Sequence, residues 1–220
     1  MVQREAILKG NITGVFFRYV TPGVIGMVGM SLYILADTYF IANGVGRLGL
    51  AALNIGLPAY NLIFGIGALL GIGGGTVFSI LHGRGELGRA NRPFTISAVL
   101  GTAFSLLFAL LGLVAAEPIA FLLGATEETA LYTTTYLRVI LLFSPAFILN
   151  NIMTAFVRND GNPHLAMAAM TISTLTNIVL DYVCIYPLKL GMFGAALATG
   201  LGSVLGLLIQ LTHFLRRGNS

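Results

Sequence analysis

The chain has 220 residues, of which 56% are hydrophobic and only 9% are charged. A soluble domain carries about 25% charged residues, so the composition excludes that class and indicates an integral membrane protein. The net charge of +4 comes from basic residues that stand singly or in short loops, and we therefore expect no nucleic-acid partner. A single cysteine, Cys184, excludes an intrachain disulfide framework.

Six apolar segments are each long enough to cross a bilayer, which takes about 20 residues of helix. They cover residues 14–43, 50–81, 94–116, 132–157, 164–187 and 192–215. The breaks between them are polar or rich in turn residues, as in NGVGRLG, RNDGNP and GATEET. Pro22, Pro58 and Pro145 are candidate kinks. The predicted fold class is all-α: a polytopic membrane protein built as a single bundle of six transmembrane helices.

The basic residues predict the orientation of these helices. Most of them fall on one side of the bundle, namely Arg4, Lys9, Arg84, Arg89, Arg92, Arg158, Arg216 and Arg217. Arg47 and Lys189 fall on the other side. The first side is therefore expected to be cytoplasmic and to hold both termini, in a multi-pass protein of a plasma membrane, specifically a prokaryotic cytoplasmic membrane.

Two acidic residues lie within the predicted spans, where a carboxylate costs roughly 2.5 to 3.5 kcal/mol on insertion scales. Asp37 lies in the stretch LADTYFIANGVG, in the outer half of the first span, and Asp181 lies in the outer half of the fifth. Asn177 is one helical turn from Asp181, on the same face. Tyr136 and Thr199 lie at a similar depth. If the helices form a bundle, these five side chains can converge.

Carboxylate, amide and hydroxyl oxygens suit a proton or a hard cation such as Na⁺, and two nearby carboxylates titrate as a coupled unit. We therefore predict a site for H⁺ or Na⁺, with Asp37, Asn177 and Asp181 as the Na⁺ ligands. No other metal is expected, because His82, His164 and His213 are scattered. No organic cofactor is expected either. The alternative for each polar residue is a contact between helices.

Four further polar residues are candidates for the lining of a cavity. Tyr33 lies one turn from Asp37, Asn54 and Asn61 are seven residues apart on the second span, and Asn150 lies on the fourth. A hydrogen bond between helices is the alternative for these residues as well.

Several stretches resemble the multidrug and toxic compound extrusion (MATE) family. The segment ADTYFIANGVGRLGLAALNIGLPAYNLIFGIGALLGIGGGT is similar to that family's first two helices, and RNDGNP, TNIVLDYVCIY and GMFGAALATG are similar to its region from helix four to helix six. The resemblance implies a secondary active antiporter, not an enzyme, that exports organic cations in exchange for H⁺ or Na⁺. It also implies cation-site roles for Asp37, Asn177 and Asp181 and, by spacing alone, for Tyr136 and Thr199.

The resemblance covers only the amino-terminal six-helix half of a twelve-helix fold. It implies either a fragment or a lobe that pairs with a second six-helix lobe, supplied by another copy or by a separate chain. Alternatives are a flippase for lipid-linked oligosaccharides and a structural half-protein without transport. An intramembrane aspartyl protease is disfavoured, because LA and VL precede the two aspartates where that class has other residues.

Overall fold

The computed structural model describes residues 12–215, which form helices and turns without a strand. The helices are α2 (Ile12–Gly44), α3 (Arg47–Gly83), α4 (Leu87–Val114), α5 (Ala116–Leu122), α6 (Glu127–Leu142), α7 (Ser144–Asn159), α8 (Pro163–Ile185) and α9 (Gly191–Leu215). The predicted all-α class is confirmed. Arg4, Lys9, Arg216 and Arg217 lie outside the described residues.

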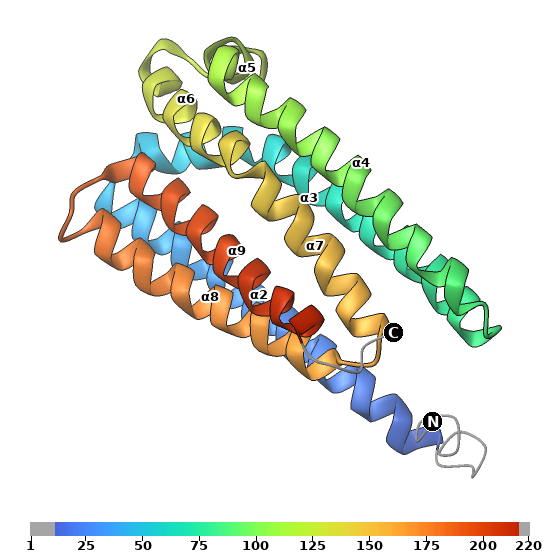
Figure 1. Ribbon diagram of the computed structural model, residues 1–220. Helices are drawn as coiled ribbons and strands as arrows, with labels where there is room; N and C mark the ends of the chain where they lie inside the picture. Colours follow the sequence, from blue (N-terminus) through green and yellow to red (C-terminus); the bar gives the residue numbers. More distant parts are fainter. Residues whose placement is uncertain (1–11, 216–220) are drawn as a thin grey trace.

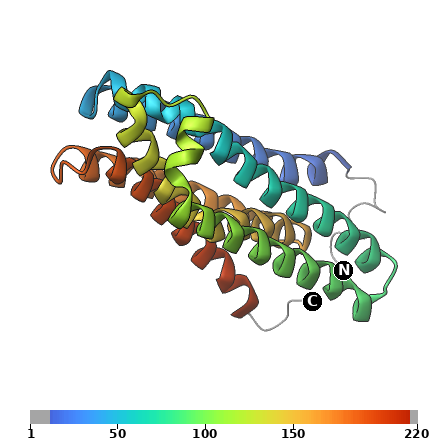
Figure 2. The ribbon, with the colours of Figure 1, turned by 90° about the horizontal axis from the view of Figure 1, so that it is seen from above.

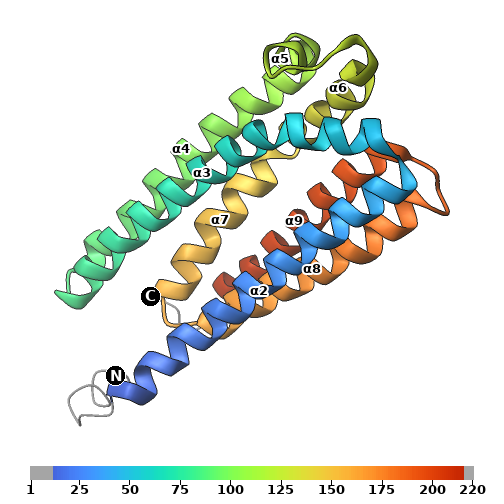
Figure 3. The same ribbon diagram turned by 180° about the vertical axis from the view of Figure 1, so that it is seen from behind.

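The helices form two groups that lie against each other (Figure 1, Figure 3). In one group, α8 packs against both α9 and α2, and in the other α3 packs against both α4 and α7. Contacts of α9 with α6 and α7 join the groups. Seen from above in Figure 2, the long helices run roughly side by side. The interior between the groups is the place where polar side chains from several helices can meet.

Each of the six predicted spans overlaps an observed helix, and the fourth overlaps two. Within residues 12–215, four helices, α3, α4, α8 and α9, are long and apolar enough to cross a membrane, and α6 with α7 makes a fifth if the bent pair is one span. The first predicted span corresponds to the 33-residue α2, which packs along α8. The start of α2 and the end of α9 lie at the same end of the bundle (Figure 1), as the distribution of basic residues predicted.

The fourth predicted span is broken rather than continuous. α6 ends at Leu142, α7 begins at Ser144, and the two axes differ by 49°. Pro145 occupies the first turn of α7, where its missing N–H costs nothing, so the kink predicted there is confirmed. Helix α3 instead continues through Pro58 and bends (Figure 3), and α2 continues through Pro22.

The outer connection between α4 and α6 is more ordered than the predicted break. Ala116–Leu122 forms the short helix α5 where only turn-rich chain was expected. α6 then begins at Glu127, because Thr126 and Thr129 form a reciprocal capping box in which the Thr126 N–H donates to the Thr129 hydroxyl at 2.9 Å. The negative charges of Glu127 and Glu128 in the first turn also stabilise α6, because they lie at the positive end of its dipole.

Glycines on α3 allow α7 to approach its backbone closely. A Cβ atom added to Gly71 would lie 3.0 Å from the Asn151 carbonyl oxygen and 3.1 Å from the Ile152 Cα, and one added to Gly67 would lie 3.1 Å from the Ile148 Cα. These are backbone atoms, which cannot rotate away. Close approach at small residues is a principal source of helix association in membranes, so this contact holds the second group together.

We expect Gly71→Val to destabilise the protein by about 1–3 kcal/mol or more, because α7 must move away from α3. Gly73→Val on the same helix is the matched control, since an added Cβ there meets nothing within 4 Å. The measurement is the thermal stability of the detergent-solubilised protein by size-exclusion chromatography. Equal stability of the two variants would contradict the tight α3–α7 contact.

Candidate functional site

The two predicted carboxylates are both buried inside the bundle. Asp37 on α2 is 6% exposed, and Asp181 on the neighbouring α8 is 0% exposed. One oxygen of each, Oδ1, has no hydrogen-bond partner among the described residues. The two groups are close enough for their charges to interact. Two buried carboxylates with unpartnered oxygens on adjacent helices are costly unless a proton or another cation neutralises them.

Asn177 joins Asp181 to α9. In the amide orientation that gives both ends of the side chain a partner, its N–H donates to Asp181 Oδ2 at 3.1 Å and its oxygen accepts from the backbone N–H of Thr199 at 3.1 Å. The Thr199 hydroxyl donates in turn to the Ala195 carbonyl at 3.1 Å. Asn177 is 4% exposed and Thr199 6%. The amide therefore fixes the orientation of one carboxylate and connects α8 to α9.

Three tyrosines, from α2, α3 and α6, surround the carboxylates. Tyr136 on α6 is buried, and it lies within electrostatic reach of both Asp37 and Asp181. Its ring packs against Gly56 of α3, where an added Cβ would lie 2.7 Å from the ring. Tyr33, one turn from Asp37, lies against Tyr60 of α3. The phenols thus place neutral hydroxyl groups from α2, α3 and α6 around the acidic pair.

All five residues predicted for the site are buried in one region, to which α2, α6, α8 and α9 contribute. The oxygens available there come from two carboxylates, an amide and hydroxyl groups. Within residues 12–215, no group of three or more His, Cys, Asp or Glu side chains is arranged to hold a metal ion. A transition-metal centre is therefore not indicated by the described residues, whereas the oxygen-rich set fits a proton or Na⁺.

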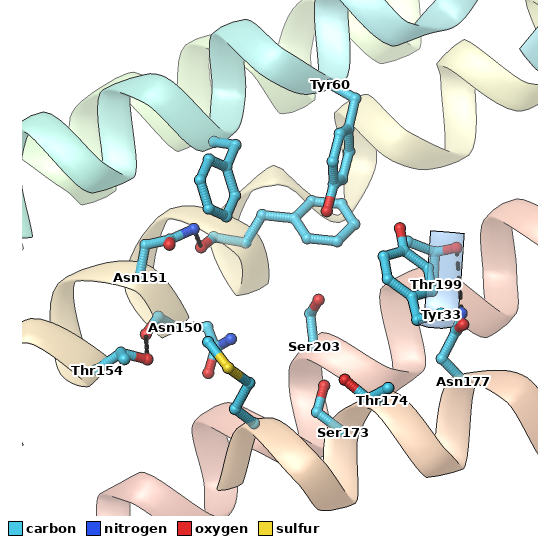
Figure 4. Close-up of a pocket in the computed structure, with 13 residues that line it drawn as sticks. Tyr33, Tyr60, Asn150, Asn151, Thr154, Ser173, Thr174, Asn177, Thr199 and Ser203 are labelled. Atoms are coloured by element: carbon cyan, nitrogen blue, oxygen red, sulfur yellow. Dashed lines mark hydrogen bonds between the residues drawn. The ribbon is translucent and has the colours of Figure 1, made fainter. Parts of the chain in front are cut away.

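A cavity of about 110 Å³ adjoins this cluster toward the cytoplasmic end of the lobe. Figure 4 shows the side chains that line it. Its lining consists of Tyr33, Tyr60, Phe64, Phe147, Asn150, Asn151, Thr154, Met170, Ser173, Thr174, Asn177, Thr199 and Ser203. None of these side chains is charged. Asn177 and Thr199 belong to both the cavity and the acidic cluster, so the two are continuous.

Of the four residues predicted to line a cavity, Tyr33 and Asn150 line this one. Asn54 and Asn61 lie on the exposed side of α3 and do not take part in it. The Asn54 amide instead donates to the Leu50 carbonyl in its own helix at 2.9 Å. Sequence reasoning missed Ser173 and Ser203, although they follow the helical spacing of four residues from Asn177 and Thr199.

Comparison with known proteins agrees with this architecture. The model of the MatE family matches residues 22–183. A multidrug export protein MepA from Staphylococcus saprophyticus subsp. saprophyticus is 33% identical over 99% of this chain and 47% of its own length. A MepA protein from Staphylococcus aureus (strain MRSA252) is 30% identical over 96% of this chain and 47% of its own.

A solved structure shows the same relation in three dimensions. The MATE multidrug transporter DinF-BH matches with a TM-score of 0.89 and 32% identity, over 95% of this chain and 47% of that chain. The fold and the buried site therefore place the chain in the class of multi-pass membrane proteins, as one lobe of the fold. The chain belongs to the MatE family. It spans about half the length of the curated relatives that it matches.

We expect Asp181→Asn to raise the melting temperature of the protein at pH 9, where a carboxylate carries the largest share of negative charge. Asp181 is fully buried and one of its oxygens is unpartnered, and a neutral amide is easier to bury than a carboxylate. Glu127→Gln, at an exposed position, is the control and should lower the melting temperature slightly, because it loses only a surface interaction with the helix dipole. A lower melting temperature in Asp181→Asn would mean that the carboxylate stabilises the fold.

Proposed function

We propose that the chain is one lobe of a cation-coupled antiporter that exports organic cations, with Asp37 and Asp181 binding the coupling H⁺ or Na⁺. The observation that carries the proposal is the pair of buried acids on adjacent helices, each with an unpartnered oxygen. The names of the relatives, multidrug export protein and multidrug transporter, support the direction of transport.

The electrostatics of the pair support coupling to a cation. Two carboxylates in a low-dielectric interior repel each other, and a bound cation removes that repulsion. A site that is stable only when neutralised takes up a cation when the outer side is open and loses it when the inner side is open. Export is then driven if the bound cation and the bound substrate favour different conformations of the transporter, which is a coupling free energy between the two sites.

The polarity of the cavity favours a cationic cargo over an anionic one. Its lining contains aromatic rings and neutral amides and hydroxyls, with no Lys or Arg. Aromatic faces attract organic cations, whereas a pyrophosphate head group calls for Arg or Lys partners. The flippase alternative therefore has no supporting observation in the described cavity.

The proposal also requires a second lobe. Alternating access in secondary transporters arises when one repeat or bundle moves against another around a central site. The chain covers about half of its curated relatives, so the second six-helix lobe is proposed to come from another copy of the chain, from a separate chain or from the rest of a longer polypeptide.

The sharpest test of the coupling role is Asp37→Asn. We expect the variant to fold, because the amide has the same shape and no charge to bury. An imposed H⁺ or Na⁺ gradient should no longer drive efflux of a fluorescent organic cation from vesicles containing the assembled transporter. Asn177→Ala should weaken cation affinity by removing a polar partner of Asp181, and Thr199→Val should have a smaller effect. Wild-type efflux in Asp37→Asn would show that this carboxylate is not the coupling group.

Controls separate coupling from folding in this experiment. Glu127→Gln removes a carboxylate from the exposed first turn of α6 and should retain wild-type efflux. Expression level and monodispersity are measured for every variant. Asp181→Asn, which removes the charge at the second carboxylate, should abolish gradient-driven efflux in the same way as Asp37→Asn.

The requirement for a second lobe predicts that the chain as a monomer gives only background efflux. Two differently tagged copies should copurify from membranes if another copy supplies the second lobe. If a separate lobe is needed, coexpression with the carboxy-terminal half of the S. saprophyticus relative should restore efflux. Cross-linking that detects only monomer, together with full gradient-driven efflux, would contradict the proposal.

A further inference from the structure

A line of buried polar side chains follows one face of α9 from the acidic cluster to the cytoplasmic end of the lobe. Thr199, Ser203, Gln210 and His213 succeed one another at helical spacing, and all but Ser203 are at most 6% exposed. Gln210 follows Thr199 by 11 positions, which is about 16 Å along the helix. The line therefore covers much of the inner half of the membrane.

Gln210 is the central feature of this line. It is 1% exposed, and its Nε2 donates to Asn150 Oδ1 at 2.7 Å and to Thr154 Oγ1 at 3.0 Å, both on α7. Gly206, one turn away on α9, permits this contact, because an added Cβ would lie 3.1 Å from Asn150 Oδ1. Asn150 and Thr154 also line the 110 Å³ cavity, whereas Gln210 does not. Gln210 thus lies directly beyond that cavity.

The carbonyl oxygen of Gln210 has no hydrogen-bond partner among the described residues. A side chain whose only role was to join α7 to α9 would not need a buried acceptor without a partner, because such a group is costly in an apolar interior. An amide oxygen is, however, a good ligand for a passing hard cation or a hydrogen-bonded water. The amide oxygen of Gln210 therefore supplies a free acceptor between the residues that line the first cavity and His213.

Beyond Gln210, the line reaches an acid and a histidine from different helices. His213 Nε2 lies 2.7 Å from Asp160 Oδ2, and His213 Nδ1 lies 3.4 Å from the Asn162 side-chain nitrogen. Asp160 and His213 line a second, smaller cavity of about 40 Å³ at the cytoplasmic end. The polar line thus begins at the acidic pair, Asp37 and Asp181, and ends at a second pair of ionisable side chains, Asp160 and His213.

We propose that this line is the inner exit route of the coupling cation, with Gln210 as the gate between the central cavity and the cytoplasmic cavity at Asp160 and His213. The inference rests on the proposed coupling role of Asp37 and Asp181. A cation released from the acidic pair passes Asn177, Thr199 and Ser203 into the cavity. It then passes Gln210, whose hydrogen bonds to α7 close the route when intact.

The test uses Gln210→Met in the assembled transporter reconstituted in vesicles. Methionine keeps the length of the side chain but offers no amide oxygen. Cation entry is followed under an imposed inward gradient with pyranine for H⁺ and, in a parallel arm, with a sodium-sensitive dye for Na⁺. We expect entry to slow by about tenfold, because the apolar side chain still fills the route and offers a cation no oxygen at the barrier, so that loss of the hydrogen bonds to α7 opens no polar path. Equilibrium stabilisation by the same cation should be unchanged, because the acidic pair is intact.

Thr212→Val is the matched control, since Thr212 is exposed at the same depth of α9 and its hydroxyl donates only to the Ile209 carbonyl. It should leave cation entry at the wild-type rate. Thr154→Val, which removes the partner hydroxyl of Gln210 with little change in shape, decides the question if Gln210→Met fails to fold. Removing that hydroxyl weakens the closed gate while the amide oxygen stays, so cation entry should be faster than in the wild type. An unchanged rate in Thr154→Val would then overturn the gate.

The outcomes separate the two proposals. Wild-type entry in Gln210→Met overturns the exit route while gradient-driven efflux by the unmodified transporter upholds the proposed function. Loss of cation stabilisation in Gln210→Met also overturns the exit route, since it would make Gln210 part of the binding site. Absence of any gradient-driven flux in the unmodified transporter refutes the proposed function, and the exit route with it.

Discussion

The rest of the lobe depends on keeping two carboxylates inside a membrane-spanning bundle. Asp37 and Asp181 lie on neighbouring helices, and lipid offers neither of them a partner. Every nearby helix therefore contributes a polar group: an amide from α8, a hydroxyl from α9 and phenols from α2, α3 and α6. The glycines of α3 serve the same end, because Gly56 lets the Tyr136 ring approach the acidic pair. The site is thus a property of the packing of five helices and not of any one motif.

The break between α6 and α7 gives this arrangement its geometry. Tyr136 on α6 reaches the carboxylates and Asn150 on α7 reaches α9. The axes of α6 and α7 differ by 49°, so a continuous straight helix could not make both contacts. The break frees backbone carbonyls, which must be satisfied without water in a membrane. The Ser144 hydroxyl lies 2.6 Å from the Leu141 carbonyl and 2.9 Å from the Ser105 carbonyl of α4. The kink is therefore a buried, hydrogen-bonded joint.

Hydrophobic length was enough to predict the helices, and depth arithmetic was enough to predict that Asp37, Asn177 and Asp181 share a layer. Rotation about each helix axis was not predictable, because the spans are apolar on nearly every side. Asn54 and Asn61 accordingly lie on an exposed face that sequence spacing could not distinguish from a buried one. The contacts of Gln210 with Asn150 and of His213 with Asp160 join residues more than fifty positions apart. Only the packing of α7 against α9 brings them together.

Within the proposed transporter, the burial of the helices distinguishes cation binding, which occurs inside the lobe, from alternation of access, which occurs between lobes. In an apolar stretch of 18 residues, 50% of α9 is buried inside the lobe, against 22–28% of α3, α4 and α8. Among these four helices α9 is thus the most enclosed, and it carries the polar line from the acidic cluster to the cytoplasmic end. All ligands proposed for the cation come from within this one lobe, so cation binding needs no second lobe. Alternation of access does need one, because a bundle that encloses its own site cannot rock against itself. Binding and transport are therefore separable in this chain.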